Sequence, residues 1–166
     1  MNTASKLTLA ALALVVTAVT TAQAQGVNGS ITATASVQSP ITVSGTTNLS
    51  FGNVFPGINK LVAVTDAGAG LFSVTGQAST PVTYSFTLPT NLTNGGNNLP
   101  IGSWTGEHNG TASPTGGTSF TPSGVAAGAT LSGGGQLFLY VGATVTPANN
   151  LPAGTYTNTV TLTVSY

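Results

Sequence analysis

Apolar and polar residues alternate along most of this chain with a period of two, as they do in β-strands. After residue 24, no window of useful length repeats with the period of an α-helix. β-branched and aromatic residues fill the apolar positions, and Gly, Pro and Asn interrupt the runs. The pattern therefore predicts an all-β protein. Strands are expected near residues 41–43, 49–51, 62–64, 72–74, 82–88, 137–145 and 156–166.

The number and spacing of these strands predict the fold class. About eight or nine short strands of unequal length favour an immunoglobulin-like antiparallel β-sandwich over a barrel. The chain has no strict internal repeat, which argues against a solenoid. Residues 90–135 are less regular, but the Asn-Gly pairs at 94–95 and 109–110 predict turns. Trp104 and Phe120 are expected to anchor this stretch to the core.

The N-terminus has the layout of a secretory signal peptide. Lys6 precedes an apolar run over residues 7–21, and Ala-Gln-Ala at 22–24 forms a cleavage pattern of small residues. The run is short for a bilayer span, and the order of these features argues against a buried helix or a membrane anchor. We predict a signal peptide over residues 1–24 and a mature chain from Gln25, exported through the periplasm to the cell surface or beyond it.

Charge is almost absent from the chain, at 2% of residues with a formal net charge of zero. After the predicted signal peptide, the charged side chains are Lys60, Asp66 and Glu107, and His108 is the single histidine. The lack of clustered Lys or Arg argues against binding to nucleic acid or to an anionic membrane. The lack of Cys excludes disulfides and thiolate metal sites. Little electrostatic repulsion opposes self-association, and a neutral polar surface also suits glycan binding.

The segment after the predicted cleavage site has the pattern of a strand without an obvious partner. Residues 30–37 alternate strictly, and Ser39-Pro40 provides a hinge before the next predicted strand. We therefore divide the mature chain into an extension over residues 25–40 and a β-sandwich domain over residues 41–166. The alternation permits two interpretations: a strand donated to another sheet, or the first strand of a self-sufficient sandwich. One face of the segment consists of Ile31, Ala33, Ala35 and Val37.

Two sequence segments resemble secreted bacterial β-sandwich families. The first is LSFGNVFPG at residues 49–57, and the second is GTY at 154–156 followed by an alternating strand that ends at Tyr166. The pair is similar to elements of the spore coat protein U and chaperone–usher pilin group. It is more similar still to a related family of small secreted β-sandwich domains of uncharacterised function.

This resemblance implies a mode of assembly. In chaperone–usher pilins, the terminal strand borders a groove that the N-terminal extension of the next subunit fills. The donor residues here would be Ile31, Ala33, Ala35 and Val37, and the partners would be copies of the chain. The resemblance leaves open whether a periplasmic chaperone and an outer-membrane usher are also partners, because the terminal aromatic is the last residue and the common Cys pair is absent. The terminal strand beside the acceptor groove would present Tyr156, Val160, Leu162, Val164 and Tyr166.

The residues available for catalysis are few. Glu107 and His108 are adjacent, and we expect them at an exposed loop tip in a Gly- and Asn-rich stretch. Paired-carboxylate chemistry would need Asp66 near Glu107, and no metal-ligand spacing is present. The glycines at 133–135 lack the following Gly-Lys of a phosphate loop. We predict that the chain is not an enzyme and has no cofactor or metal site.

The sequence thus favours a structural subunit of an extracellular fibre, pilus or surface coat that is assembled by β-strand addition. The alternative is a monomeric secreted module that binds carbohydrate or another surface. In that case Trp104, Tyr140 and Tyr84 would be the candidates for a sugar platform, although aromatic residues in a sandwich of this size are more often core.

Overall fold

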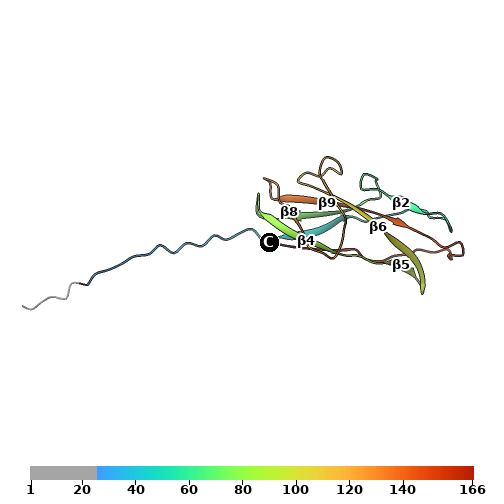
Figure 1. The fold of residues 1–166 in the computed structure, drawn as a ribbon, viewed down its shortest axis with the longest axis horizontal. Helices are drawn as coiled ribbons and strands as arrows, with labels where there is room; N and C mark the ends of the chain where they lie inside the picture. The colour runs from blue at the N-terminus through green and yellow to red at the C-terminus, as the bar shows by residue number, and fades with distance from the viewer. Residues whose placement is uncertain (1–25) are drawn as a thin grey trace, which may run out of the picture. The chain divides into compact units, whose positions relative to one another are not determined.

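The computed structural model describes residues 26–166, so the predicted signal peptide and its cleavage site lie outside the described residues. The described part contains ten β-strands and no helix (Figure 1). The strands form two antiparallel sheets, which confirms the predicted all-β sandwich. None of the described residues belongs to a helix long and apolar enough to cross a membrane. The chain divides into two units after Ala35, and all ten strands belong to the second, Ser36–Tyr166.

The larger sheet has seven strands, and β9 lies at its centre. Its main path runs β1, β3, β9, β6, β5, while β2 also pairs with β9 and β7 with β6. The strands are β1 (Thr42–Thr47), β2 (Lys60–Val62), β3 (Gly70–Thr75), β5 (Asn91–Asn94), β6 (Asn97–Asn109), β7 (Thr118–Phe120) and β9 (Gln136–Val145).

The smaller sheet has three strands in the order β10 (Thr161–Ser165), β4 (Pro81–Thr87) and β8 (Ala127–Thr130). Strand β4 alternates as predicted, with Val82, Tyr84 and Phe86 buried between exposed or half-buried neighbours. The smaller sheet therefore covers one face of the larger sheet with a single apolar surface.

The core consists of two apolar clusters. In the first, alternate residues of β9 pack with residues of β3, β4 and β10 between the sheets. The second lies around Leu99, Ile101, Ala143 and Val145. Trp104 packs against both clusters and Phe120 against the first, so both act as the predicted anchors. The first cluster contains Val74, Val82, Tyr84, Phe86, Leu131, Leu137, Leu139, Val141 and Leu162.

The irregular stretch of sequence contains the longest strand. Strand β6 spans 13 residues, and its pairing with β9 shifts between Gly102 and Thr105. Ser103 in this bulge has a positive φ of 47°. A bulge inserts an extra residue and changes which face later side chains occupy, so a strict period of two could not reveal this strand. The predicted Asn-Gly turn at 94–95 is confirmed as the tip of the β5–β6 hairpin.

Three predicted strands differ from the structure. The strand expected near residues 62–64 lies earlier, as β2 over Lys60–Val62, and Val64 is in a turn. Residues 49–51 are not a strand but follow β1 as a half-buried loop. The terminal strand is shorter than predicted, because β10 begins only at Thr161, opposite Thr87 at the end of β4. The ladder stops there because Pro89, just beyond β4, has no N–H to donate.

Candidate functional site

The predicted donor segment is not a strand of its own sandwich. Residues 26–40 contain no strand, and the first strand of the body is β1. The side chains of Ile31 and Val37 are 97% and 96% exposed. Ala33 and Ala35 are exposed as well. The apolar side chains on the alternating face of this segment are therefore all exposed.

The sandwich has two sheet edges next to each other. Strand β1 ends the larger sheet and pairs there with β3, and β10 ends the smaller sheet and pairs with β4. Cα atoms of β1 and β10 come within 8 Å of one another. Neither strand has a second partner among the described residues. Each therefore presents backbone N–H and C=O groups on its outer side, which can accept another strand.

A groove opens beside these two edges. Its first part, of about 430 Å³, lies between the residues that end β1 and the segment 156–160 that precedes β10. Strands of the larger sheet and the segment before β10 line it. The apolar lining residues are Leu49, Phe51, Phe72, Leu92, Ile101, Val141, Tyr156 and Val160.

The groove continues into a second hollow of about 700 Å³ between the loops 48–56 and 151–157. The two hollows share Leu49, Phe51, Leu92 and Tyr156. Among the described residues that line either hollow, none is charged. We call the two hollows together the edge groove.

The edge groove exists because the smaller sheet stops short. Residues 156–160 make no ladder with β4, and the segment is held to β5 through a bridge between Thr157 and Thr93. The hydroxyl of Tyr156 donates a hydrogen bond to the Pro152 carbonyl oxygen at 2.8 Å, which fixes the loop on that side. The lining side chains of Leu49, Phe51, Phe72, Leu92 and Val160 are consequently only half-buried.

The predicted residues of the terminal strand separate into three places. Tyr156 and Val160 line the edge groove. Leu162 is buried and Val164 half-buried, and both pack in the core between the sheets. Tyr166 is 47% exposed and hydrogen-bonds to Gln77 and Ser39.

Most of the groove lining comes from residues that the sequence analysis did not assign to a site. Phe72, Leu92, Ile101 and Val141 come from four different strands, so no local motif joins them. Leu49 and Phe51 lie in the LSFGNVFPG segment, where the alternation predicts a short strand. The sequence signal that could have revealed these two residues is their position. A short apolar pair between two turn-rich stretches is expected to be exposed.

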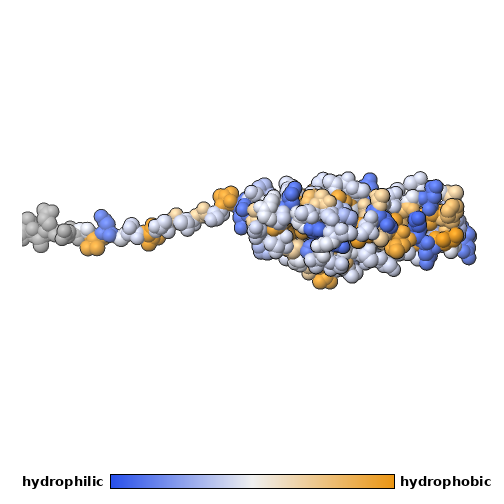
Figure 2. Space-filling view, turned by 90° about the horizontal axis from the view of Figure 1, so that it is seen from above, coloured by the Kyte–Doolittle hydropathy of each residue, from blue (hydrophilic) through white to orange (hydrophobic). Residues whose placement is uncertain are grey.

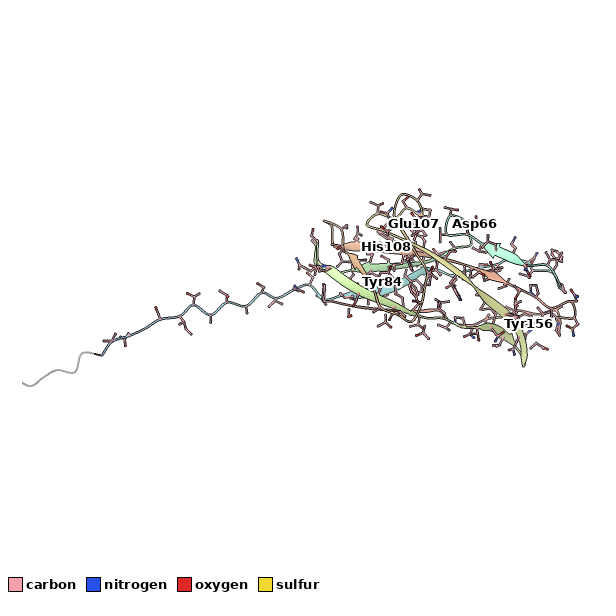
Figure 3. The ribbon with its side chains drawn as sticks, viewed as in Figure 1. Asp66, Tyr84, Glu107, His108 and Tyr156 are labelled. Carbon is pink, nitrogen blue, oxygen red and sulfur yellow. The ribbon has the colours of Figure 1, made fainter. Side chains whose placement is uncertain are left out.

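The prediction that Glu107 and His108 lie at an exposed loop tip is wrong. Both residues are in β6 and are half-buried (Figure 3). The imidazole lies 5.8 Å from the ring centroids of both Tyr84 and Phe120. Burial lowers the pKa of His108, and the nearby Glu107 carboxylate partly offsets this effect. The ring is thus part of an aromatic cluster that favours its neutral form.

The two carboxylates of the described chain each accept a local backbone hydrogen bond. Glu107 Oε1 accepts from the Gly117 N–H at 2.8 Å, and Asp66 Oδ2 accepts from the Ala63 N–H at 2.9 Å. Within residues 26–166, no group of three His, Cys, Asp or Glu side chains could hold a metal ion. Through these hydrogen bonds, Glu107 and Asp66 each stabilise a turn of the backbone.

The residues considered for a sugar platform do not form one surface. Tyr84 is buried in the core, where burial raises the pKa of its phenol. Trp104 packs between the two core clusters. Tyr140 is half-buried in the central strand β9, and burial raises the pKa of its phenol as well.

No protein-family model matches this chain, and no curated protein is similar to it.

Proposed function

We propose that this protein is an exported structural subunit of an extracellular fibre, pilus or surface coat, assembled by β-strand addition. Residues 30–37 of one copy occupy the edge groove of another copy. The observation that carries the proposal is the pairing of two features in one chain. The chain has an alternating segment without a sheet, and a sandwich with two neighbouring free edges over half-buried apolar side chains.

The backbone supports this proposal because a strand added to a free sheet edge satisfies the unpaired hydrogen-bonding groups of that edge. Strand β1 offers one edge and β10 the other. Each net ladder hydrogen bond contributes about 0.5–1.5 kcal/mol. Eight residues of extended chain span about 26 Å, which is longer than six-residue β1 and reaches into the loop after it.

The side chains support it through hydrophobic burial. Ile31 and Val37 are exposed in the free chain, and burying each one releases roughly 1.5–3 kcal/mol. The docked face would also cover half-buried groove residues such as Phe51 and Val160. Since no charged residue lines the edge groove, no ion has to be desolvated when the strand docks.

The experiment compares the two faces of residues 30–37 in the full mature chain. Ile31→Asp with Ala33→Asp places charges on the face that is proposed to dock. Thr32→Asp with Thr34→Asp adds the same charge to the opposite face and is the matched control. We expect electron microscopy and size-exclusion chromatography to show polymers for the control and monomers for the first variant.

Two further results bear on the proposal. A chain that lacks residues 25–38 should stay monomeric, and a synthetic peptide of residues 26–38 should bind and stabilise it. Polymers from the Ile31→Asp, Ala33→Asp chain and from the deleted chain would contradict strand addition. Monomers from the unmodified chain would favour a monomeric binding module instead.

A further inference from the structure

Three hydrogen bonds connect Ser39, at the root of the extension, with Gln77 and with Tyr166, which follows β10. The Tyr166 hydroxyl accepts from the Gln77 N–H at 2.7 Å and donates to the Ser39 carbonyl oxygen. The Ser39 N–H donates to the Gln77 side-chain oxygen at 3.3 Å. Both backbone groups of Ser39 are therefore held by two residues that are distant in sequence. We call these three bonds the Ser39 clamp.

The surrounding residues are shaped to hold the Tyr166 side chain. A Cβ at Gly76 would lie 2.7 Å from the Tyr166 hydroxyl and 2.9 Å from a Leu131 methyl carbon, so a larger residue would displace the ring. The Gly76 N–H is also bonded to the Gly135 carbonyl oxygen at 2.9 Å. The pocket for Tyr166 is thus a fixed part of the β3–β4 turn.

The chain on the other side of Ser39 is also restrained. Pro40 fixes its own φ and restricts Ser39 to extended conformations. Ile41 then packs against the first core cluster. The clamp and these two residues fix the point where the extension joins the sandwich.

We propose that Tyr166 and Gln77 are positioning residues that couple occupancy of the edge groove to the root of the subunit's own extension. Tyr166 directly follows β10, and β10 continues from the segment 156–160 that lines the edge groove. A docked strand restrains β10 to its end and thereby holds the Tyr166 hydroxyl on Ser39. A subunit that has accepted a strand then presents its own extension from a fixed root. The inference rests on the proposed function.

The test measures amide hydrogen exchange of Ser39 and Gln77 by NMR in the monomeric Ile31→Asp, Ala33→Asp chain. The probe is a synthetic peptide of residues 26–38. Saturating peptide should slow exchange at both amides. Tyr166→Phe keeps the ring but removes both hydroxyl bonds, so without peptide we expect exchange at the Gln77 amide to accelerate roughly 2- to 12-fold. This variant should still bind the peptide, but binding should no longer slow exchange at Ser39.

Two additional variants separate the clamp from general stability of β10. Gln77→Ala removes only the bond to the Ser39 N–H and should accelerate exchange at Ser39 alone. Ser165 also lies in β10, and its hydroxyl is hydrogen-bonded to that of Thr83 in β4 at 2.9 Å. Ser165→Ala removes this bond and should leave the coupling intact.

The outcomes distinguish the two proposals. Peptide that binds without slowing exchange at Ser39 in the parent chain overturns the coupling and leaves strand addition in place. Loss of coupling in Ser165→Ala equal to that in Tyr166→Phe also overturns it. A peptide that does not bind the parent chain overturns strand addition, and the coupling with it.

Discussion

At the scale of single residues, packing around β6 depends on very small side chains. Gly106 lies directly beneath the Phe120 ring, and a Cβ there would clash with that ring. Phe120 in turn stacks on Phe86 with ring centroids 5.8 Å apart. The absence of a side chain at Gly106 thus allows β7 to contribute an aromatic residue to the core.

We expect Gly106→Ala to reduce the free energy of unfolding by about 1–3 kcal/mol, because overpacking forces the Phe120 ring out of its position. Gly102→Ala is the matched control in the same strand, since a Cβ at Gly102 has no atom within 4 Å. Urea unfolding of both variants measures the difference. Equal stability of the two variants would show that Phe120 adapts without cost.

A second prediction at this scale concerns pH. The pKa of His108 in the folded protein is lowered by burial, below the value of about 6.5 expected in the unfolded chain. The unfolded chain therefore binds more protons in the window between the two pKa values. Stability contributed by neutral His108 is complete above about pH 6.5 and decreases as the pH falls through the folded-state pKa.

Thermal unfolding across this window should show that the melting temperature of the unmodified chain decreases as the pH is lowered. His108→Phe retains an aromatic ring beside Tyr84 and Phe120 but cannot be protonated, so its melting temperature should stay nearly constant. An equal slope in both proteins would place the titrating group elsewhere.

At the scale of strands, the early end of the β10 ladder and the bulge in β6 both shape the edge groove. The ladder of β10 ends opposite Thr87 and leaves residues 156–160 apart from β4. The bulge between Gly102 and Thr105 lets β6 stay paired with β9 from Ile101 to Asn109 while Trp104 packs into the core. The open side of the sandwich is therefore a consequence of a proline after one strand and of the unequal sizes of the sheets.

At the scale of the whole molecule, the surface is polar but nearly uncharged. The space-filling view shows a mostly pale surface with scattered hydrophobic residues (Figure 2). Residues 26–40 contain no charged side chain, and none lines the edge groove. Strand docking in this protein is therefore expected to depend on backbone pairing and apolar burial.

Polymerisation should consequently be insensitive to simple salt. Between about 0.05 M and about 1 M NaCl, screening weakens exposed ion pairs strongly but leaves apolar contacts intact. We expect light scattering to show no loss of polymer over this range, and sulfate to favour assembly. Polymers that dissolve in NaCl would indicate ionic contacts between subunits and would count against docking through the edge groove.

The sequence by itself determined the fold class and the places of β1, β3, β4, β9 and β10, but not those of β5, β6, β7 and β8. Strict alternation in β4, and the recurrence of apolar residues at every second position of β9, are enough to place each strand and its buried face, because side chains of a strand alternate between two faces. The Asn-Gly pair at 94–95 fixed a hairpin for an equally local reason. The alternation of residues 30–37 is typical of a strand, but alternation does not identify a partner, and these residues form no strand in the described chain.

Only the tertiary structure decided which edges stay open and which residues meet there. The lining of the edge groove comes from residues as far apart as Leu49 and Val160, and the Ser39 clamp joins residues 127 positions apart. Such contacts depend on strand order and on where each ladder stops. These properties arise from pairing between distant segments, and no single segment of the sequence encodes them.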